Sequence, residues 1–125
     1  MQLTFLGKET SGGQSPTLYA TDRWTYVVQG WIVTDPVILS LLKLSDDETV
    51  VEVPARLMAH LTKDGLAGEV INHVPPIVYI KGNGNLIVQG IRVTDPEAMA
   101  EMNIPDHETC VEVGKTRVKA LVEPR

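Results

Sequence analysis

The chain alternates short runs of β-branched and aromatic residues with short polar turns, a pattern that predicts strands interrupted by brief helices. Residues 2–7 predict a short first strand, and residues 17–21 predict a second. Glycine, serine and a closing proline make residues 9–16 a predicted loop between them. A longer strand, rich in valine and aromatic residues, is predicted from about residue 24 to residue 33.

The sequence of the predicted long strand and of the residues on either side of it recurs 60 positions later in the chain. Residues 16–53 align without a gap with residues 76–113, and 15 of these 38 pairs are identical. The agreement is densest where both copies read Val-Gln-Gly and then Val-Thr-Asp-Pro. Such a match indicates an internal duplication, which takes precedence over other interpretations of the pattern.

Each long strand is predicted to end at its Thr-Asp-Pro sequence, where a helix begins. Asp35 and Asp95 are suited to accept hydrogen bonds from the free N–H groups of a first helical turn. The proline that follows each aspartate lacks the N–H group that would be unpaired at that position. The spacing of apolar residues then predicts short helices over about 36–43 and 96–103.

After each short helix comes a closing strand, predicted over 48–53 in the first copy and 108–113 in the second. Residues 54–61 predict a further helix that starts at a proline. The corresponding residues 114–121 are more β-branched and basic, which leaves their form open between a helix, a strand and a frayed tail. Residues 62–73 are predicted to be a polar, flexible linker.

The predicted unit is therefore β-β-α-β, used over about residues 14–61 and again over about 74–121. A chain of 125 residues is long enough for one compact core and too short for two enzymatic domains. The predicted fold class is thus α+β, with residues 1–125 forming a single domain. Two tandem repeats that share a core would form one pseudo-two-fold symmetric body, either a small barrel or two packed layers.

The composition limits where in the cell the protein is expected and which kinds of partner it is expected to bind. A net charge of −5 without any basic run argues against direct nucleic-acid binding. Cys110 is the only cysteine, so no internal disulfide can form, and a reducing cytoplasm is the predicted location. No apolar stretch has the length of a membrane span, and the N-terminus lacks the charged start of a signal peptide.

Four segments of the first copy resemble a family of small uncharacterised actinobacterial proteins of the Streptomyces type. They are residues 15–23 (SPTLYATDR), 25–31 (TYVVQGW), 33–36 (VTDP) and 48–54 (ETVVEVP). The resemblance covers about residues 1–61, and the second copy keeps only the skeleton of the pattern. It implies a companion of helix-turn-helix regulators in developmental or specialised-metabolite gene neighbourhoods, with no established activity. If single-unit members act as homodimers, this chain resembles a fused dimer.

Gln29 and Gln89 are polar residues in the middle of the two long strands. Gln29 falls on an otherwise apolar face, where a buried amide needs hydrogen-bonding partners. We favour a hydrogen bond to a loop or to the other copy over a contact with a ligand. Gly30 and Gly90, which follow them, indicate a bulge or a close approach of two backbones.

Aromatic residues are the other candidates for binding a ligand or a partner, and they are Trp24, Tyr26, Trp31, Tyr19 and Tyr79. Both tryptophans occur in the first copy only, as expected for a pocket wall or an interface anchor, and equally for core residues. A pocket between the repeats would be lined by Trp31, Tyr26 and methionines, with Gln29 orienting the ligand.

The sequence predicts no catalytic residue, no metal ligand and no cofactor. Its three histidines are scattered without zinc-binding spacing, and no phosphate-binding loop or dinucleotide motif is present. The leading hypothesis is a non-enzymatic protein-interaction or regulatory module, a partner of a helix-turn-helix regulator encoded nearby. The alternative is a small barrel enzyme or binder of a small hydrophobic molecule in actinobacterial specialised metabolism. A purely structural subunit, monomeric or homodimeric, is the third.

Overall fold

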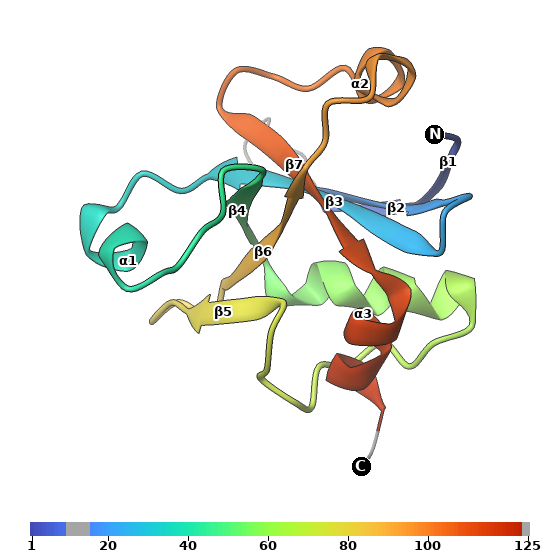
Figure 1. The fold of residues 1–125 in the computed structure, drawn as a ribbon. Coiled ribbons are helices and arrows are strands. Elements are labelled where there is room, and N and C mark those ends of the chain that lie inside the picture. The colour runs from blue at the N-terminus through green and yellow to red at the C-terminus, as the bar shows by residue number, and fades with distance from the viewer. Residues whose placement is uncertain (10–15, 124–125) are drawn as a thin grey trace.

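The computed structural model describes residues 1–9 and 16–123 and shows a mixed α/β fold built on a seven-stranded antiparallel sheet (Figure 1). The strands are β1 (Leu3–Lys8), β2 (Thr17–Thr21), β3 (Thr25–Ile32), β4 (Glu48–Val53), β5 (Ile77–Ile80), β6 (Leu86–Arg92) and β7 (Glu108–Gly114). The helices are α1 (Pro36–Ser40), α2 (Pro96–Met102), α3 (Lys115–Val122) and the 3-10 helix η1 (Ala55–Asp64). Most of the predicted loop over 9–16 lies outside the described residues.

Four of the strands pair in a closed ring. The long strand β3 pairs with β7 from Thr25 to Trp31, and β6 pairs with β4 along the whole of β4. Short pairings of β3 with β4 and of β6 with β7 complete the ring. Each closing strand therefore runs along the long strand of the other half of the chain, and the first half (residues 14–61) and the second half (residues 74–121) interlock.

The main core lies between the sheet and two helices that lie together on one side of it, η1 and α3 (Figure 1). Leu57 and Leu61 of η1 and Leu121 of α3 are buried there against strand residues such as Val51 and Val111. Burial of this apolar surface is the main stabilising contribution to the fold.

Two smaller apolar clusters lie beside the short helices α1 and α2. One consists of Val33, Ile38, Val50 and Ile87, and the other of Val27, Val93, Ala98, Met102 and Cys110. Four members of the first cluster have their counterpart 60 positions away in the second. Tyr79 packs against the first cluster and Tyr19 against the second.

The predicted starts of the short helices are confirmed. Asp35 accepts a hydrogen bond from the N–H group of Val37 at 2.9 Å, and Asp95 accepts one from Ala98 at 3.0 Å. Both helices end before the predicted residue, α1 at Ser40 and α2 at Met102. In α2 the next residue adopts a left-handed conformation, which stops the helix.

The prediction for residues 114–121 is settled in favour of a helix, α3, so the strand and frayed-tail alternatives are wrong. Buried Val118, Leu121 and Val122 give this segment a helical apolar face that overrides its β-branched composition. The predicted 62–73 linker also needs correction, because η1 continues into it as far as Asp64. Further along, the side chain of Asn72 donates to the carbonyl oxygen of Ala120 at 2.8 Å.

The predicted close approach at the two strand glycines is confirmed. A Cβ atom on Gly30 would lie 2.5 Å from the backbone oxygen of Glu52, and one on Gly90 would lie 2.6 Å from that of Glu112. No side chain fits at that distance, so glycine is required where each long strand crosses a closing strand.

Candidate functional site: an aromatic pocket between the halves

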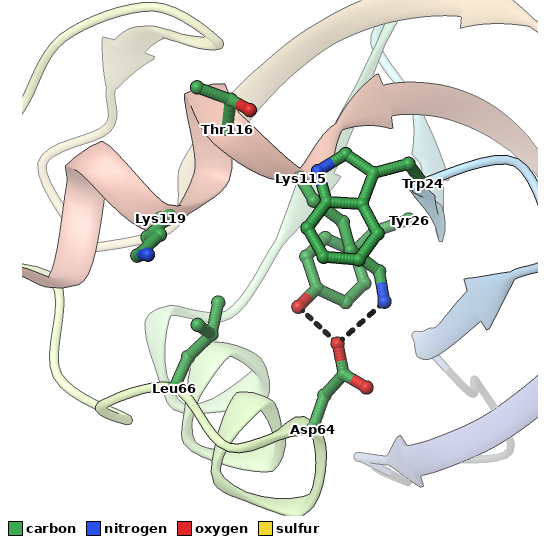
Figure 2. Close-up of a pocket in the computed structure, with 7 residues that line it drawn as sticks. All are labelled: Trp24, Tyr26, Asp64, Leu66, Lys115, Thr116 and Lys119. Atoms are coloured by element: carbon green, nitrogen blue, oxygen red, sulfur yellow. Dashed lines mark hydrogen bonds and ion pairs between the residues drawn. The ribbon is translucent and has the colours of Figure 1, made fainter.

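A pocket of about 340 Å³ lies where the β2–β3 hairpin meets the end of η1 and the start of α3 (Figure 2). It is lined by Trp24, Tyr26, Asp64, Leu66, Lys115, Thr116 and Lys119. The lining residues come from the first half, the linker and the second half. Two of the aromatic residues proposed from the sequence, Trp24 and Tyr26, thus meet in one pocket.

Trp24 forms one wall of this pocket from an unusual backbone position. Its φ angle is 60°, in the left-handed region, and its side chain is 71% exposed. Gly84, its counterpart in the second half, has a φ of 88°. The tight hairpin requires this conformation, which glycine adopts easily and a bulky residue adopts at a cost of about 1–2 kcal/mol. The carbonyl oxygen of Trp24 accepts a hydrogen bond from the N–H group of Lys115 at 3.1 Å, which holds the wall in place.

Tyr26, Asp64 and Lys115 form a polar triad at the base of the pocket. The Tyr26 hydroxyl donates to Oδ2 of Asp64 at 2.6 Å, and Nζ of Lys115 forms an ion pair with the same oxygen at 2.9 Å (Figure 2). Burial raises the pKa of the Tyr26 hydroxyl, and its hydrogen bond to the negative Asp64 raises it further. Burial alone would also raise the pKa of Asp64, but the Tyr26 and Lys115 hydrogen bonds outweigh it, and the net pKa is lowered. The triad therefore holds a neutral phenol, a carboxylate and an ammonium group.

Lys115 also lies against both aromatic rings, with Nζ 4.9 Å from the centre of the Trp24 ring and 5.2 Å from that of Tyr26. Cation–π attraction therefore adds to its ion pair with Asp64. This cation is committed to its neighbours and is poorly placed as a free nucleophile or base. The arrangement suits binding better than catalysis, because Trp24 and Leu66 offer apolar contact at the pocket. The exposed Lys119, which forms an ion pair with Glu123 at 3.7 Å, adds a positive charge at the rim.

The structure does not assemble the pocket expected from Trp31, Tyr26, methionines and Gln29. Tyr26 and Gln29 lie three positions apart along β3, so their side chains point to opposite faces of the sheet. Gln29 and Tyr19 line a second hollow of about 310 Å³ together with Met102. Trp31 lies at a third, open site beside Ile32.

Gln29 is buried, as predicted, and donates from Nε2 to Oε1 of Glu108 at 2.8 Å. This is the predicted hydrogen bond to the other half of the chain. Gln89 is only half-buried, and its Nε2 donates to the carbonyl oxygen of Lys43 at 3.2 Å. Tyr79 packs beside α1, away from the aromatic pocket.

Sequence reasoning missed Asp64 and Lys115, because one lies in the supposed linker and the other in the segment whose form was open. It also missed an apolar surface on α1. Val37 is 66% exposed and Leu41, just after the helix, is 64% exposed. Their counterparts 60 positions later in α2 are Glu97 and Glu101. This difference between two segments 60 positions apart can be read from the sequence and could have located the surface.

Neither a family model, nor a curated protein, nor a solved structure matches this chain. Within the described ranges, no helix combines the length and the apolar character needed to cross a bilayer. The functional interpretation therefore rests on the geometry described above.

Proposed function

We propose that this chain is an internally duplicated, non-enzymatic protein-interaction module. Its two repeats would form one pseudo-two-fold symmetric body, consistent with the expected fusion of two units. Reciprocal contacts support this: Glu112 accepts from Thr25 at 2.6 Å, and Glu52, 60 positions before it, accepts from Asn85, 60 positions after Thr25, at 2.8 Å.

The observation that carries the interaction role is the exposed apolar surface of α1 and the turn after it. The members of this surface are Val37, Leu39, Leu41 and Leu44. They are exposed within a span of eight residues, whereas the corresponding span of the second half carries two glutamates. Val37 and Leu41 are four positions apart and so share one face of this turn. Exposed apolar residues that share a face mark sites where another protein excludes water.

The partner that best suits the chain is a basic protein, such as a helix-turn-helix regulator encoded nearby. The net charge of −5 would attract a positively charged DNA-binding domain and speed their encounter. Such a partner would contact the α1 surface with its own apolar residues and the exposed carboxylate of Asp35, at the start of α1, with a basic one. Binding of this kind would compete with DNA for the regulator.

The test is the native mass of the protein purified gently from its own cells. The wild-type chain should carry a stoichiometric second polypeptide, and the double variant Val37→Ser with Leu41→Ser should lose it at an unchanged melting temperature. The matched control is Glu97→Ser with Glu101→Ser at the corresponding positions of α2. A wild-type chain of bare mass, or a complex that survives the α1 variant, would refute the proposal.

A second candidate function is favoured by the aromatic pocket, whose volume of about 340 Å³ suits a small molecule. Its lining fits a flat apolar ring beside Trp24 with an acidic group directed to Lys119. The probe 1-naphthoate should raise the melting temperature of the wild-type chain and that of a Lys119→Arg variant, but not that of Trp24→Ala or Lys119→Met. Equal stabilisation of all four would exclude the pocket as the site.

A further inference from the structure

The strand β5 lies at the edge of the sheet, and no described strand pairs with its outer side. Its counterpart β2 occupies the same position in the first half but is covered by β1. The inner pairing agrees at Tyr19 opposite Val27 and Tyr79 opposite Ile87, but β5 has a register shift between Ile77 and Tyr79 that β2 lacks. The outer side differs, since Ala20 of β2 is 5% exposed and Ile80 of β5 is 39% exposed.

Three contacts show what β1 contributes to the half that it covers. The ring of Phe5 meets that of Tyr19 edge-on, with centres 6.1 Å apart and planes at 70°. Leu3 and Met1 pack onto the apolar cluster beside α2. The Met1 ammonium group forms an ion pair with Asp95 at 3.0 Å, and this lowers the pKa of Asp95 after the larger effect of the Ala98 N–H group.

The other half has counterparts of the three groups that β1 contacts, and no described strand lies beside them on the outer side of β5. Tyr79 corresponds to Tyr19, the cluster beside α1 corresponds to that beside α2, and Asp35 corresponds to Asp95. Asp35 is exposed and forms no ion pair within the described residues. Residues 63–68, which stand 60 positions after β1, are the end of η1 and the turn after it. This chain therefore does not supply the missing strand from the corresponding segment.

We propose that β5 binds an extended segment of a partner protein, added to the sheet as β1 is added to β2. The segment carries an aromatic residue that meets Tyr79, an apolar residue two positions before it, and a cationic group that reaches Asp35. This inference rests on the proposed interaction role and specifies the partner's binding element. Pairing with the unsatisfied backbone groups of an edge strand supplies affinity, and the alternating side chains supply specificity.

The charge of Asp35 and the position of the α1 surface are consistent with a partner segment bound at β5. The exposed carboxylate of Asp35 at the start of α1 needs a cation, and a basic partner supplies one. Val37 and Leu41 lie on the same short segment as Asp35, next to the apolar cluster beside α1. The strand site and the α1 surface thus form one continuous interface.

The probe is a peptide with the sequence of residues 1–8, labelled on Lys8 and titrated against the full chain by fluorescence polarisation. We expect saturable binding and changes in the backbone NMR shifts of the full chain centred on residues 78–80.

Three variants of the full chain test the site. Ile80→Lys should weaken peptide binding about tenfold, because a charged side chain replaces an apolar one on the edge strand. Asp35→Asn keeps the helix cap and should weaken binding about two- to fivefold. Asp106→Asn, at an exposed turn, is the matched control and should bind as the wild type does.

Backbone pairing is tested with two further peptides, methylated on alternate backbone amides. Alternate amides of a strand point to opposite edges. One peptide should therefore lose at least about tenfold in affinity, and the other should bind like the parent. Absence of binding at 1 mM (roughly −4 kcal/mol), equal binding of both methylated peptides, or shifts centred on 17–21 would each overturn the proposal. A native complex that is lost in the α1 variant but kept in Ile80→Lys and Asp35→Asn would refute the strand site alone.

Discussion

Gln29 and Glu108 lie 79 residues apart in the sequence and form a buried contact at 2.8 Å between the two halves of the chain. Both are almost fully buried, at 3% and 4% exposure. The corresponding Gln89 is half-exposed; it donates to the carbonyl oxygen of Lys43, and its side chain also hydrogen-bonds that of Glu48, the counterpart of Glu108. The same pair of residues is therefore buried in one half and half-exposed in the other.

This difference predicts unequal effects of the same substitution. Gln29→Leu removes a donor from a buried carboxylate and should lower the free energy of unfolding by about 1–3 kcal/mol. Gln89→Leu, the matched control, should cost less than about 1 kcal/mol because water can replace its hydrogen bond. Urea unfolding of both variants measures the comparison. Equal losses would contradict the structural role assigned to Gln29.

Tyr26→Phe tests the triad at the base of the aromatic pocket. The ring stays buried while the hydroxyl that donates to Asp64 is lost. Asp64 keeps its ion pair with Lys115, so the expected loss is about 0.5–1.5 kcal/mol of unfolding free energy. Chemical denaturation at pH 7 checks it, and an unchanged stability would show that the hydrogen bond contributes nothing net.

Asp64 also predicts a pH dependence. Its pKa in the folded protein lies below the ordinary value of 3.8. Its stabilising contribution is therefore fully present above that value and is lost as the pH falls through the folded pKa. The stability gap between the wild type and Asp64→Asn should shrink between pH 6 and pH 3. A gap that grows on acidification would reverse the sign of the inferred shift.

The pattern of residues predicted the local elements well, because their signals are local. Alternation located β2 and β3, and Asp-Pro located the starts of α1 and α2. The glycines after Gln29 and Gln89 pointed correctly to close backbone contacts. Each of these features depends on neighbours in the sequence or on the conformation of a single residue.

The candidate site could be predicted only in part. Trp24 and Tyr26 were proposed, but their partners Asp64 and Lys115 come from segments 38 and more residues away, placed by the packing of η1 and α3. Pairing of β3 with β7 brings these segments together, and no local pattern encodes that pairing. The separation of Tyr26 from Gln29, by contrast, follows from strand alternation alone.

The left-handed backbone of Trp24 leads us to expect that a glycine variant is more stable than an alanine variant, the reverse of the usual order. Trp24→Ala and Trp24→Gly both remove the indole, but alanine retains the cost of a φ angle of 60° and glycine does not. The glycine variant should be more stable than the alanine variant by about 1 kcal/mol, measured by thermal or urea unfolding. If alanine is the more stable, the left-handed turn is not maintained without the indole.

Addition of a single methyl group at Gly30 is expected to cause a large loss of stability. In Gly30→Ala the new Cβ atom would meet the Glu52 carbonyl oxygen at 2.5 Å and a methyl group of Val53 at 2.6 Å. A backbone atom in a paired strand cannot move aside as a flexible side chain can, so we expect a loss of about 3 kcal/mol, the upper end for overpacking. Gly82→Ala is the control, because nothing lies within 4 Å of its Cβ position, and it should change stability by less than about 0.5 kcal/mol. Equilibrium unfolding distinguishes the two, and a Gly30→Ala variant as stable as the control would mean that β3 and β4 do not cross at this distance.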